Sequence, residues 1–95
     1  MAVKIIISRR VAKAKEEELL PLLIKLRALA ASQPGYISGE TWRNLEDPEE
    51  TLVISTWKSV DDWKAWAASK QRVEIQEGID ALLGEKTTYG IYLYG

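Results

Sequence analysis

This 95-residue chain contains no cysteine and no histidine, and these two absences restrict the chemistry that its side chains can perform. Disulfides and thiolate nucleophiles are therefore excluded. The commonest general base near neutral pH and the usual ligands of zinc and haem iron are missing as well. Proton transfer would have to use a carboxylate, a tyrosine, a lysine or water. Several enzyme classes are excluded on this ground, and the candidates that remain are acids, hydroxyls, arginines and aromatic rings.

Glu40 and Tyr36 are the candidates for proton chemistry. Simple alternation along a strand expected at 36–45 places Glu40 on the same face as Tyr36 and Trp42. Burial on that face would make the carboxylate of Glu40 a usable base, and exposure to solvent would remove that role. The hydroxyl of Tyr36 could donate a hydrogen bond or shuttle a proton in a pocket.

Three further tyrosines, Tyr89, Tyr92 and Tyr94, lie on or beside the last expected strand. Alternation puts Tyr92 and Tyr94 on the face opposite Tyr89, so at least two of the four tyrosines could simply line an interface between subunits. Which hydroxyl faces a pocket stays open.

Trp66 and Arg9 complete the candidate site. Trp66 falls on the apolar side of an expected helix, where it could stack on a flat substrate, although a tryptophan at such a position is more often part of the core. Trp57 and Trp63 are expected mainly to pack. Arg9 could stabilise an anionic intermediate, although most arginines are solvated surface residues.

No pattern in the sequence predicts a metal or a cofactor. The acidic residues at 16–18 and at 61–62 stand near expected helix starts, where carboxylates interact favourably with the helix dipole. The glycines lack the spacing that cradles a phosphate, so binding of a flavin or nicotinamide is not expected.

Charge and hydropathy limit the partners. A net charge of −1, from 13 basic and 14 acidic residues, leaves no basic surface for nucleic acid. The apolar run near the N-terminus is too short for a signal peptide or a membrane span. We therefore expect a cytoplasmic protein that binds neither nucleic acid nor membrane and whose partner is a small molecule.

The elements that must position these residues follow the expected order βαββαβ. Apolar periodicity and β-branched runs predict strands at 3–9, 36–45, 51–58 and 86–94, and helices at 14–32 and from Ser59 onward. This order predicts one α+β domain over residues 1–95, of ferredoxin-like architecture with a four-stranded antiparallel sheet.

Three residues set the expected helix boundaries. Ser59 is a suitable N-cap for the helix that follows it. Pro21 predicts a kink, or a first helix that properly begins near Leu20. Gly78 predicts that residues 70–83 form only a shorter, broken helical or looped stretch.

The strands indicate that both faces of the sheet are covered. Both helices of such a domain cover one face and leave the other open. Strands with one wet face alternate, yet residues 3–7 and 52–54 carry apolar side chains on both faces. We therefore expect the open face to pack on the same face of a second subunit, giving a closed two-fold homodimer that buries surface a small monomer could not.

Two segments resemble those of a known family. Residues 33–41, QPGYISGET, are similar to the family's segment after its first helix, and residues 54–66, ISTWKSVDDWKAW, to its segment from the third strand into the second helix. The family is that of the antibiotic biosynthesis monooxygenases (ABM), whose βαββαβ domains pair their sheets into a dimeric α/β barrel. The resemblance covers nearly the whole chain and implies the same fold and the same dimer.

The resemblance implies several activities. Members are associated with cofactor-free oxygenation of aromatic polyketides or quinols, with haem degradation, and with small-molecule isomerisation or signal turnover. For haem degradation the resemblance implies a strand-one Asn, a helix-two Trp and an axial His ten residues beyond that Trp. Trp66 matches the Trp, but Ser8 stands approximately at the Asn position and Gln76 at the His position.

Our main hypothesis is a cofactor-independent monooxygenase, an oxidoreductase acting on a small, flat, electron-rich molecule such as a quinol or polyphenol. Its candidate residues are Trp66, Glu40, Tyr36 and Arg9. The alternative is a non-catalytic dimeric module that binds a small apolar ligand, and haem degradation is a third possibility. An apolar cavity open to solvent, with Trp66 and either a tyrosine hydroxyl or Glu40 on its wall, would favour the enzyme, whereas a filled, dry core would favour the module.

Overall fold

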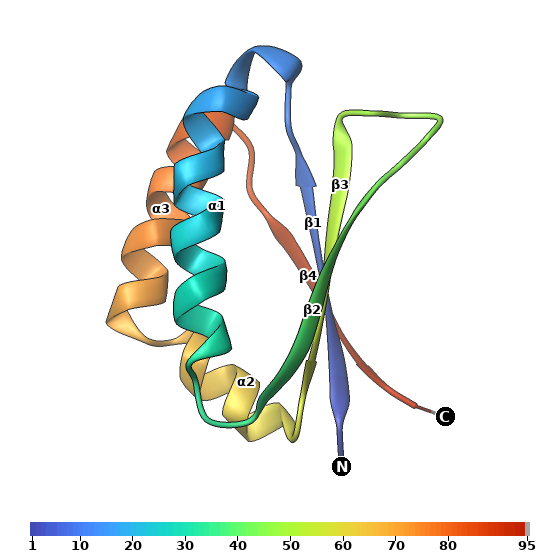
Figure 1. Ribbon diagram of the computed structural model, residues 1–95, viewed down its shortest axis with the longest axis vertical. Helices are drawn as coiled ribbons and strands as arrows, with labels where there is room; N and C mark the ends of the chain where they lie inside the picture. The colour runs from blue at the N-terminus through green and yellow to red at the C-terminus, as the bar shows by residue number, and fades with distance from the viewer. Residues whose placement is uncertain (95) are drawn as a thin grey trace.

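A four-stranded antiparallel sheet with helices on one face forms the fold of the computed structural model, which describes residues 1–94 (Figure 1). The order is βαββααβ, with a 3-10 turn at Lys13–Lys15 before the first helix. The strands are β1 (Val3–Arg10), β2 (Tyr36–Arg43), β3 (Glu50–Trp57) and β4 (Thr88–Leu93). The helices are α1 (Glu16–Ala31), α2 (Val60–Ala67) and α3 (Lys70–Leu83). The predicted α+β, ferredoxin-like class is confirmed.

Alternation along β1 divides the sheet into a covered and an open face. The strand order is β2-β3-β1-β4, and every neighbouring pair is antiparallel. Val3, Ile5, Ile7 and Arg9 of β1 are buried beneath the helices, and the residues between them face the other side. Because side chains alternate with a period of two, this strand carries Arg9 into the interior on the same face as the apolar core.

A β-bulge at the start of β2 shifts the expected alternation. The register changes between Tyr36 and Ser38, which leaves Ile37 as the extra residue. Tyr36 pairs with the buried Trp57 and lies on the covered face, whereas Glu40 is exposed and lies on the open face. The expectation that Glu40 shares a face with Tyr36 is therefore wrong, because one inserted residue moves every later side chain to the other face.

Helix α1 begins at Glu16 and continues through Pro21, so the expected start near Leu20 is wrong. The N–H that proline lacks would have bonded the carbonyl of Glu17, in the first turn of the helix. Packing offsets this loss, because Leu19 of the same helix is fully buried.

The second connection contains two helices. Ser59 caps α2 as predicted, because its hydroxyl accepts a hydrogen bond from the backbone N–H of Asp62 at 3.2 Å. Helix α3 is continuous, so the expected break at Gly78 is wrong. A glycine in a helix interior costs about 1 kcal/mol relative to alanine, and burial of Ile75 and Ile79 on the same helix outweighs it. Within residues 1–94, none of the helices combines the length and apolar character needed to cross a membrane.

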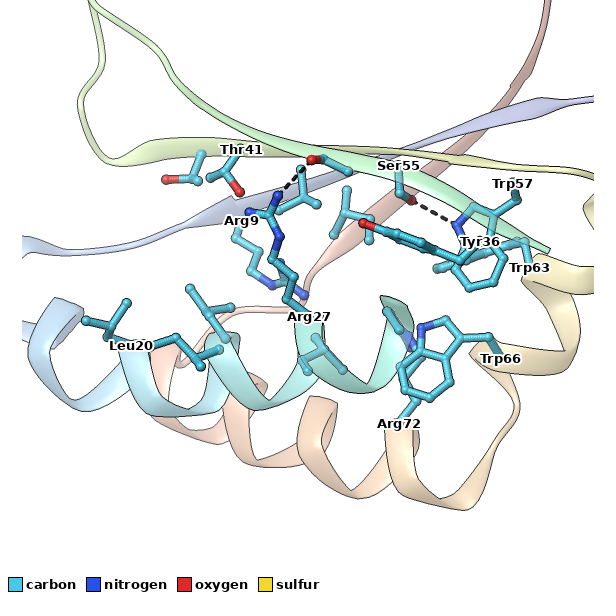
Figure 2. A pocket seen from close by; sticks show the side chains of 18 of the residues that line it. Arg9, Leu20, Arg27, Tyr36, Thr41, Ser55, Trp57, Trp63, Trp66 and Arg72 are labelled. Atoms are coloured by element: carbon cyan, nitrogen blue, oxygen red, sulfur yellow. Dashed lines mark hydrogen bonds between the residues drawn. The ribbon is translucent and has the colours of Figure 1, made fainter. Parts of the chain in front are cut away.

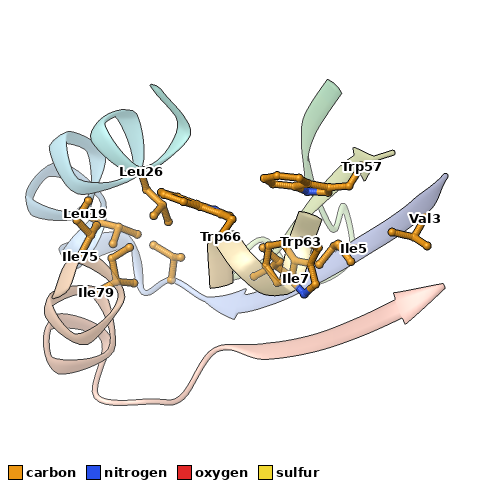
Figure 3. Close-up of a cluster of buried hydrophobic side chains, with 11 residues drawn as sticks. Val3, Ile5, Ile7, Leu19, Leu26, Trp57, Trp63, Trp66, Ile75 and Ile79 are labelled. Carbon is orange, nitrogen blue, oxygen red and sulfur yellow. The ribbon is translucent and has the colours of Figure 1, made fainter. Parts of the chain in front are cut away.

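The core lies between the sheet and the helices (Figure 3). Trp57 at the end of β3 and Trp63 of α2 fill it near the sheet, and Trp66 lies beside Leu26 of α1. The buried apolar side chains are Val3, Ile5, Ile7, Val11, Leu19, Leu26, Trp57, Trp63, Trp66, Ile75 and Ile79. Apart from Val11, which follows β1, these residues come from β1, β3 and all three helices, so the same packing that holds the fold also positions the tryptophans.

Candidate functional site

A cavity of about 260 Å³ lies between α1 and the covered face of the sheet (Figure 2). Its wall is predominantly apolar, with a few hydroxyls and three arginines. The lining residues are Ile7, Arg9, Val11, Leu20, Leu23, Ile24, Leu26, Arg27, Ala30, Tyr36, Gly39, Thr41, Thr51, Val53, Ser55, Trp57, Trp63, Trp66 and Arg72. An apolar concavity with a few convergent polar groups is the usual form of a small-molecule site.

One end of the cavity is aromatic. The ring of Tyr36 lies edge-on to that of Trp57 with centroids 5.4 Å apart, and Trp57 lies 5.8 Å from Trp63. Trp57 Nε1 donates to the hydroxyl of Ser55 at 3.1 Å, which fixes the orientation of the indole. Trp66 is only 3% exposed and lines the same end. This end offers flat apolar surfaces on which an aromatic ligand can pack.

The hydroxyl of Tyr36 lies over the backbone of Gly39. A Cβ on Gly39 would come within 2.6 Å of this oxygen, so a residue with a side chain there would displace the tyrosine ring. Both residues line the cavity. The absence of a side chain at Gly39 therefore allows Tyr36 to place a hydrogen-bonding group in an otherwise apolar wall.

Arg9 is the most deeply buried charged group of the cavity, with 4% of its surface exposed. Its Nη2 donates to Gln76 Oε1 at 3.0 Å, and its Nε has no hydrogen-bond partner within residues 1–94. Burial lowers the pKa of the Arg9 guanidinium; Tyr89 and Asp80 oppose the shift and Arg72 adds to it. An arginine nevertheless stays charged in a protein, so Arg9 is a buried cation.

Gln76 holds the guanidinium of Arg9 through a chain of hydrogen bonds. Its Nε2 donates to Asp80 Oδ1 at 2.9 Å and to the hydroxyl of Thr87 at 2.8 Å. That hydroxyl donates in turn to Asp80 Oδ1 at 3.1 Å. The network directs the amide oxygen of Gln76 at Arg9 while keeping the carboxylate of Asp80 one residue away, so the direct partner of Arg9 is neutral.

Arg72 adds a second buried cation at the aromatic end. Its guanidinium lies 5.3 Å from the ring centroid of Trp63 and 5.1 Å from that of Tyr89. Its Nη2 donates to the Tyr89 hydroxyl at 2.7 Å. Cation–π contact with both rings stabilises the guanidinium, and within residues 1–94 no carboxylate forms an ion pair with it.

Arg27 spans the mouth of the cavity from α1 to β2. Its Nη2 donates to the backbone carbonyl of Gly39 at 2.7 Å, as Figure 2 shows. The exposed lining residues Leu20, Ile24 and Thr41 belong to the same two elements. The cavity therefore reaches solvent between α1 and β2, beside an exposed guanidinium.

The structure brings three of the four candidate residues to one cavity. Trp66, Tyr36 and Arg9 line it, whereas Glu40 is exposed on the open face of the sheet. Trp66 is both a core residue and a wall of the cavity, so the two alternatives weighed for it coexist.

Arg72 and Gln76 are the functional candidates that sequence reasoning missed as site residues. They follow the spacing of the buried face of α3, with Ile75 and Ile79 at helical intervals. Two polar side chains within an apolar helical stripe are the signal that could have found them, because buried polar groups need a specific partner.

The positions aligned with haem-degrading proteins do not converge on Trp66. Ser8 pairs with Leu52 and Thr88 on the open face, outside the cavity. Gln76 is bound to Arg9, Asp80 and Thr87. Across residues 1–94, no group of three or more His, Cys, Asp or Glu side chains is placed to hold a metal ion.

Solved structures with the same fold come from several organisms. A conserved protein from Methanosarcina mazei Go1 superposes with a TM-score of 0.90 at 22% identity, covering 100% of this chain and 94% of that one. A variant of SnoaB, a cofactor-independent oxygenase from Streptomyces nogalater, superposes with a TM-score of 0.84 at 18% identity, covering 98% of this chain and 92% of that one. At these identities the likeness establishes the fold.

Sequence comparison establishes the family. Protein SchA of Streptomyces halstedii is 27% identical over 73 residues, which are 77% of this chain and 19% of SchA. This chain therefore corresponds to only 19% of the length of that relative. The family model of the antibiotic biosynthesis monooxygenases matches residues 2–78. Because this match spans most of the chain, the chain that forms the cavity belongs to the antibiotic biosynthesis monooxygenase family.

Proposed function

We propose that the chain is a cofactor-independent monooxygenase that oxidises a small, flat, electron-rich molecule, such as a quinol or polyphenol, in the cavity between α1 and the sheet. One observation carries the proposal: a solvent-connected apolar cavity whose wall combines Trp66, Tyr36 and the buried cation Arg9. The family membership and the likeness to SnoaB support it.

The charges of the cavity favour the ionised form of a phenolic substrate. A cation beside a phenol stabilises its phenolate, and Arg9 and Arg72 are both buried in the wall. No carboxylate of residues 1–94 lines the cavity, so the phenolic proton leaves to water rather than to Glu40. The resulting phenolate is rich enough in electrons to react with oxygen directly.

The reaction balances without an external reductant. A quinol and O₂ give a hydroxyquinone and water: one oxygen atom forms the new C–O bond, the other leaves as water, and the substrate supplies all the electrons. In this scheme Trp66 holds the ring flat, and the two buried guanidinium groups, those of Arg9 and Arg72, stabilise negative charge on the substrate. The hydroxyl of Tyr36 donates a hydrogen bond to the charge that develops during the reaction.

Oxygen consumption by the purified, metal-free protein tests this function. We expect saturable uptake above the rate of autoxidation with a panel of quinols and polyphenols. One atom from ¹⁸O₂ should appear in the product and one in water. Uptake no faster than in protein-free solution, across the whole panel, would contradict the proposal.

The alternative is a module that binds a small ligand without turning it over. The absence of a carboxylate base from the cavity wall within residues 1–94 favours it. Saturable ligand binding without oxygen uptake would support this second function. The same experiment therefore separates the two.

We also propose that the active form is a homodimer joined through the open faces of two sheets. Trp42 and Tyr92 are each 55% exposed on this face, and Ile6, Leu52 and Ile54 lie between them. Covering such a surface with its own copy produces a closed, self-complementary interface. The cavities lie on the other face of each sheet and stay accessible in this arrangement.

A further inference from the structure

We propose that the natural ligand of the cavity carries a carboxylate that pairs with the guanidinium of Arg9. The inference rests on the proposed function of this cavity and specifies its substrate class as flat aromatic acids. It starts from an imbalance in the structure. Arg9 is 96% removed from solvent, as its 4% exposure shows, yet within residues 1–94 the only hydrogen-bond partner of its guanidinium is the neutral amide of Gln76.

An unpaired buried cation is costly unless something compensates its charge. Arginine does not shed its proton to escape that cost. The Nε of Arg9 is a buried donor without a hydrogen-bond partner within residues 1–94, and Arg9 lines the cavity. Asp80 is the carboxylate closest in the network, and Gln76 stands between it and Arg9. Gln76 is thus a positioning residue, which fixes Arg9 and leaves its charge available.

The charges of the whole wall agree with an acidic ligand. Three arginines line the cavity, at its interior and at its mouth, and no aspartate, glutamate or lysine of residues 1–94 does so. Arg27, beside the entrance, is exposed and can attract an anion before it enters. A neutral ligand would leave both buried guanidinium groups without a direct ion-pair partner, since no carboxylate of residues 1–94 pairs with either.

The shape of the site selects a carboxylate attached to a flat ring system. The guanidinium is planar, and its neighbouring N–H groups match the two oxygens of a carboxylate. A cavity of about 150 Å³ holds benzene, so the 260 Å³ here has room for two fused rings against Trp66.

A pair of isosteric probes tests the inference. We would measure the binding of 2-naphthoate and 2-naphthamide to the whole protein by tryptophan fluorescence and calorimetry, without oxygen. The acid should bind about tenfold or more tightly than the amide, as a hydrogen bond to a charged group implies. Equal affinities, or no binding of the acid at millimolar concentration, would overturn the inference.

Variants of two adjacent arginines locate the effect. Arg9→Gln should abolish the preference for the acid, measured as the ratio of the two affinities, and Arg9→Lys should restore part of the preference. Arg10→Gln is the matched control, because Arg10 is exposed and bonds Asp47 instead. If Arg10→Gln reduces the preference as strongly as Arg9→Gln, Arg9 is not the subsite. Should Arg9→Gln fail to fold, Arg9→Lys takes its place, and loss of the preference in Arg27→Gln would overturn the assignment to Arg9, because Arg27 lines the cavity as well.

The experiments distinguish failure of the carboxylate subsite from failure of the oxygenase proposal. Preference for the acid without oxygen uptake would keep the carboxylate subsite and reject the oxygenase. Oxygen uptake with neutral and acidic substrates alike would keep the oxygenase and reject the subsite.

Discussion

Trp66 belongs both to the core and to the wall of the cavity. It packs among buried apolar side chains of three helices and the sheet, and its ring also faces the cavity. In a chain of 95 residues the core is small, and here the cavity and the core share residues. The same holds for Arg9, whose strand neighbours Ile5 and Ile7 are core residues.

Substitutions at Trp66 can separate these two roles. We expect Trp66→Ala to cost about 3–5 kcal/mol of unfolding free energy, measured by urea denaturation. Trp66→Phe should keep the fold but weaken 2-naphthoate binding by about 0.5–1.5 kcal/mol, through loss of stacking area. Leu19→Ala is the control, because Leu19 is fully buried but does not line the cavity. It should lower stability and leave the affinity unchanged; an unchanged affinity in Trp66→Phe as well would show that Trp66 is only a core residue.

Among the helices and strands, the features that depend on local periodicity could be predicted from the sequence. The strands, the Ser59 cap and the four-stranded sheet follow from alternation and capping, which involve near neighbours. Glu40 was placed on the wrong face because the bulge at Ile37 depends on pairing with β3, and alternation carries no sign of it.

The cavity itself could not be predicted from local sequence patterns. Arg9 and Gln76 are 67 positions apart and meet only because β1 and α3 pack together. Trp66 could be proposed from its place on an expected helix and its match to the family's Trp, and Tyr36 from its hydroxyl on an expected strand. The hydrogen-bond network around Arg9 depends on tertiary contacts, and it shows only as polar residues within an apolar helical stripe.

The continuity of α3 through Gly78 can be tested by substituting its glycines. Gly78 lies inside the helix, and a Cβ there would have only Leu22 Cδ1 nearby, at 4.0 Å. Gly78→Ala should therefore stabilise the protein by about 0.5–1 kcal/mol in urea denaturation. Gly84→Ala is the counterpart: Gly84 ends α3 with φ at 71°, and the change should cost about 1–2 kcal/mol. Destabilisation by Gly78→Ala would mean that α3 is not a continuous helix in solution.

In the molecule as a whole, the two faces of the sheet differ in what covers them. The covered face carries the core and the cavity, and its side chains are largely enclosed by helices. The open face carries aromatic and aliphatic side chains without a covering layer within residues 1–94. Dimerisation through that face would complete the burial that the helices begin, without obstructing the mouth between α1 and β2.

Solution size decides whether the open face is that interface. We expect a dimer by light scattering and a melting temperature that rises with protein concentration, because association stabilises the folded state by mass action. Ile54→Glu places a charge at the centre of the face and should give monomers. Leu45→Glu is the control: Leu45 is 96% exposed, in the loop after β2, and its substitution should leave the dimer intact. A monomer at every concentration would contradict a dimer through this face. Equal dissociation by both substitutions would contradict it as well, because Ile54 lies on the face and Leu45 does not.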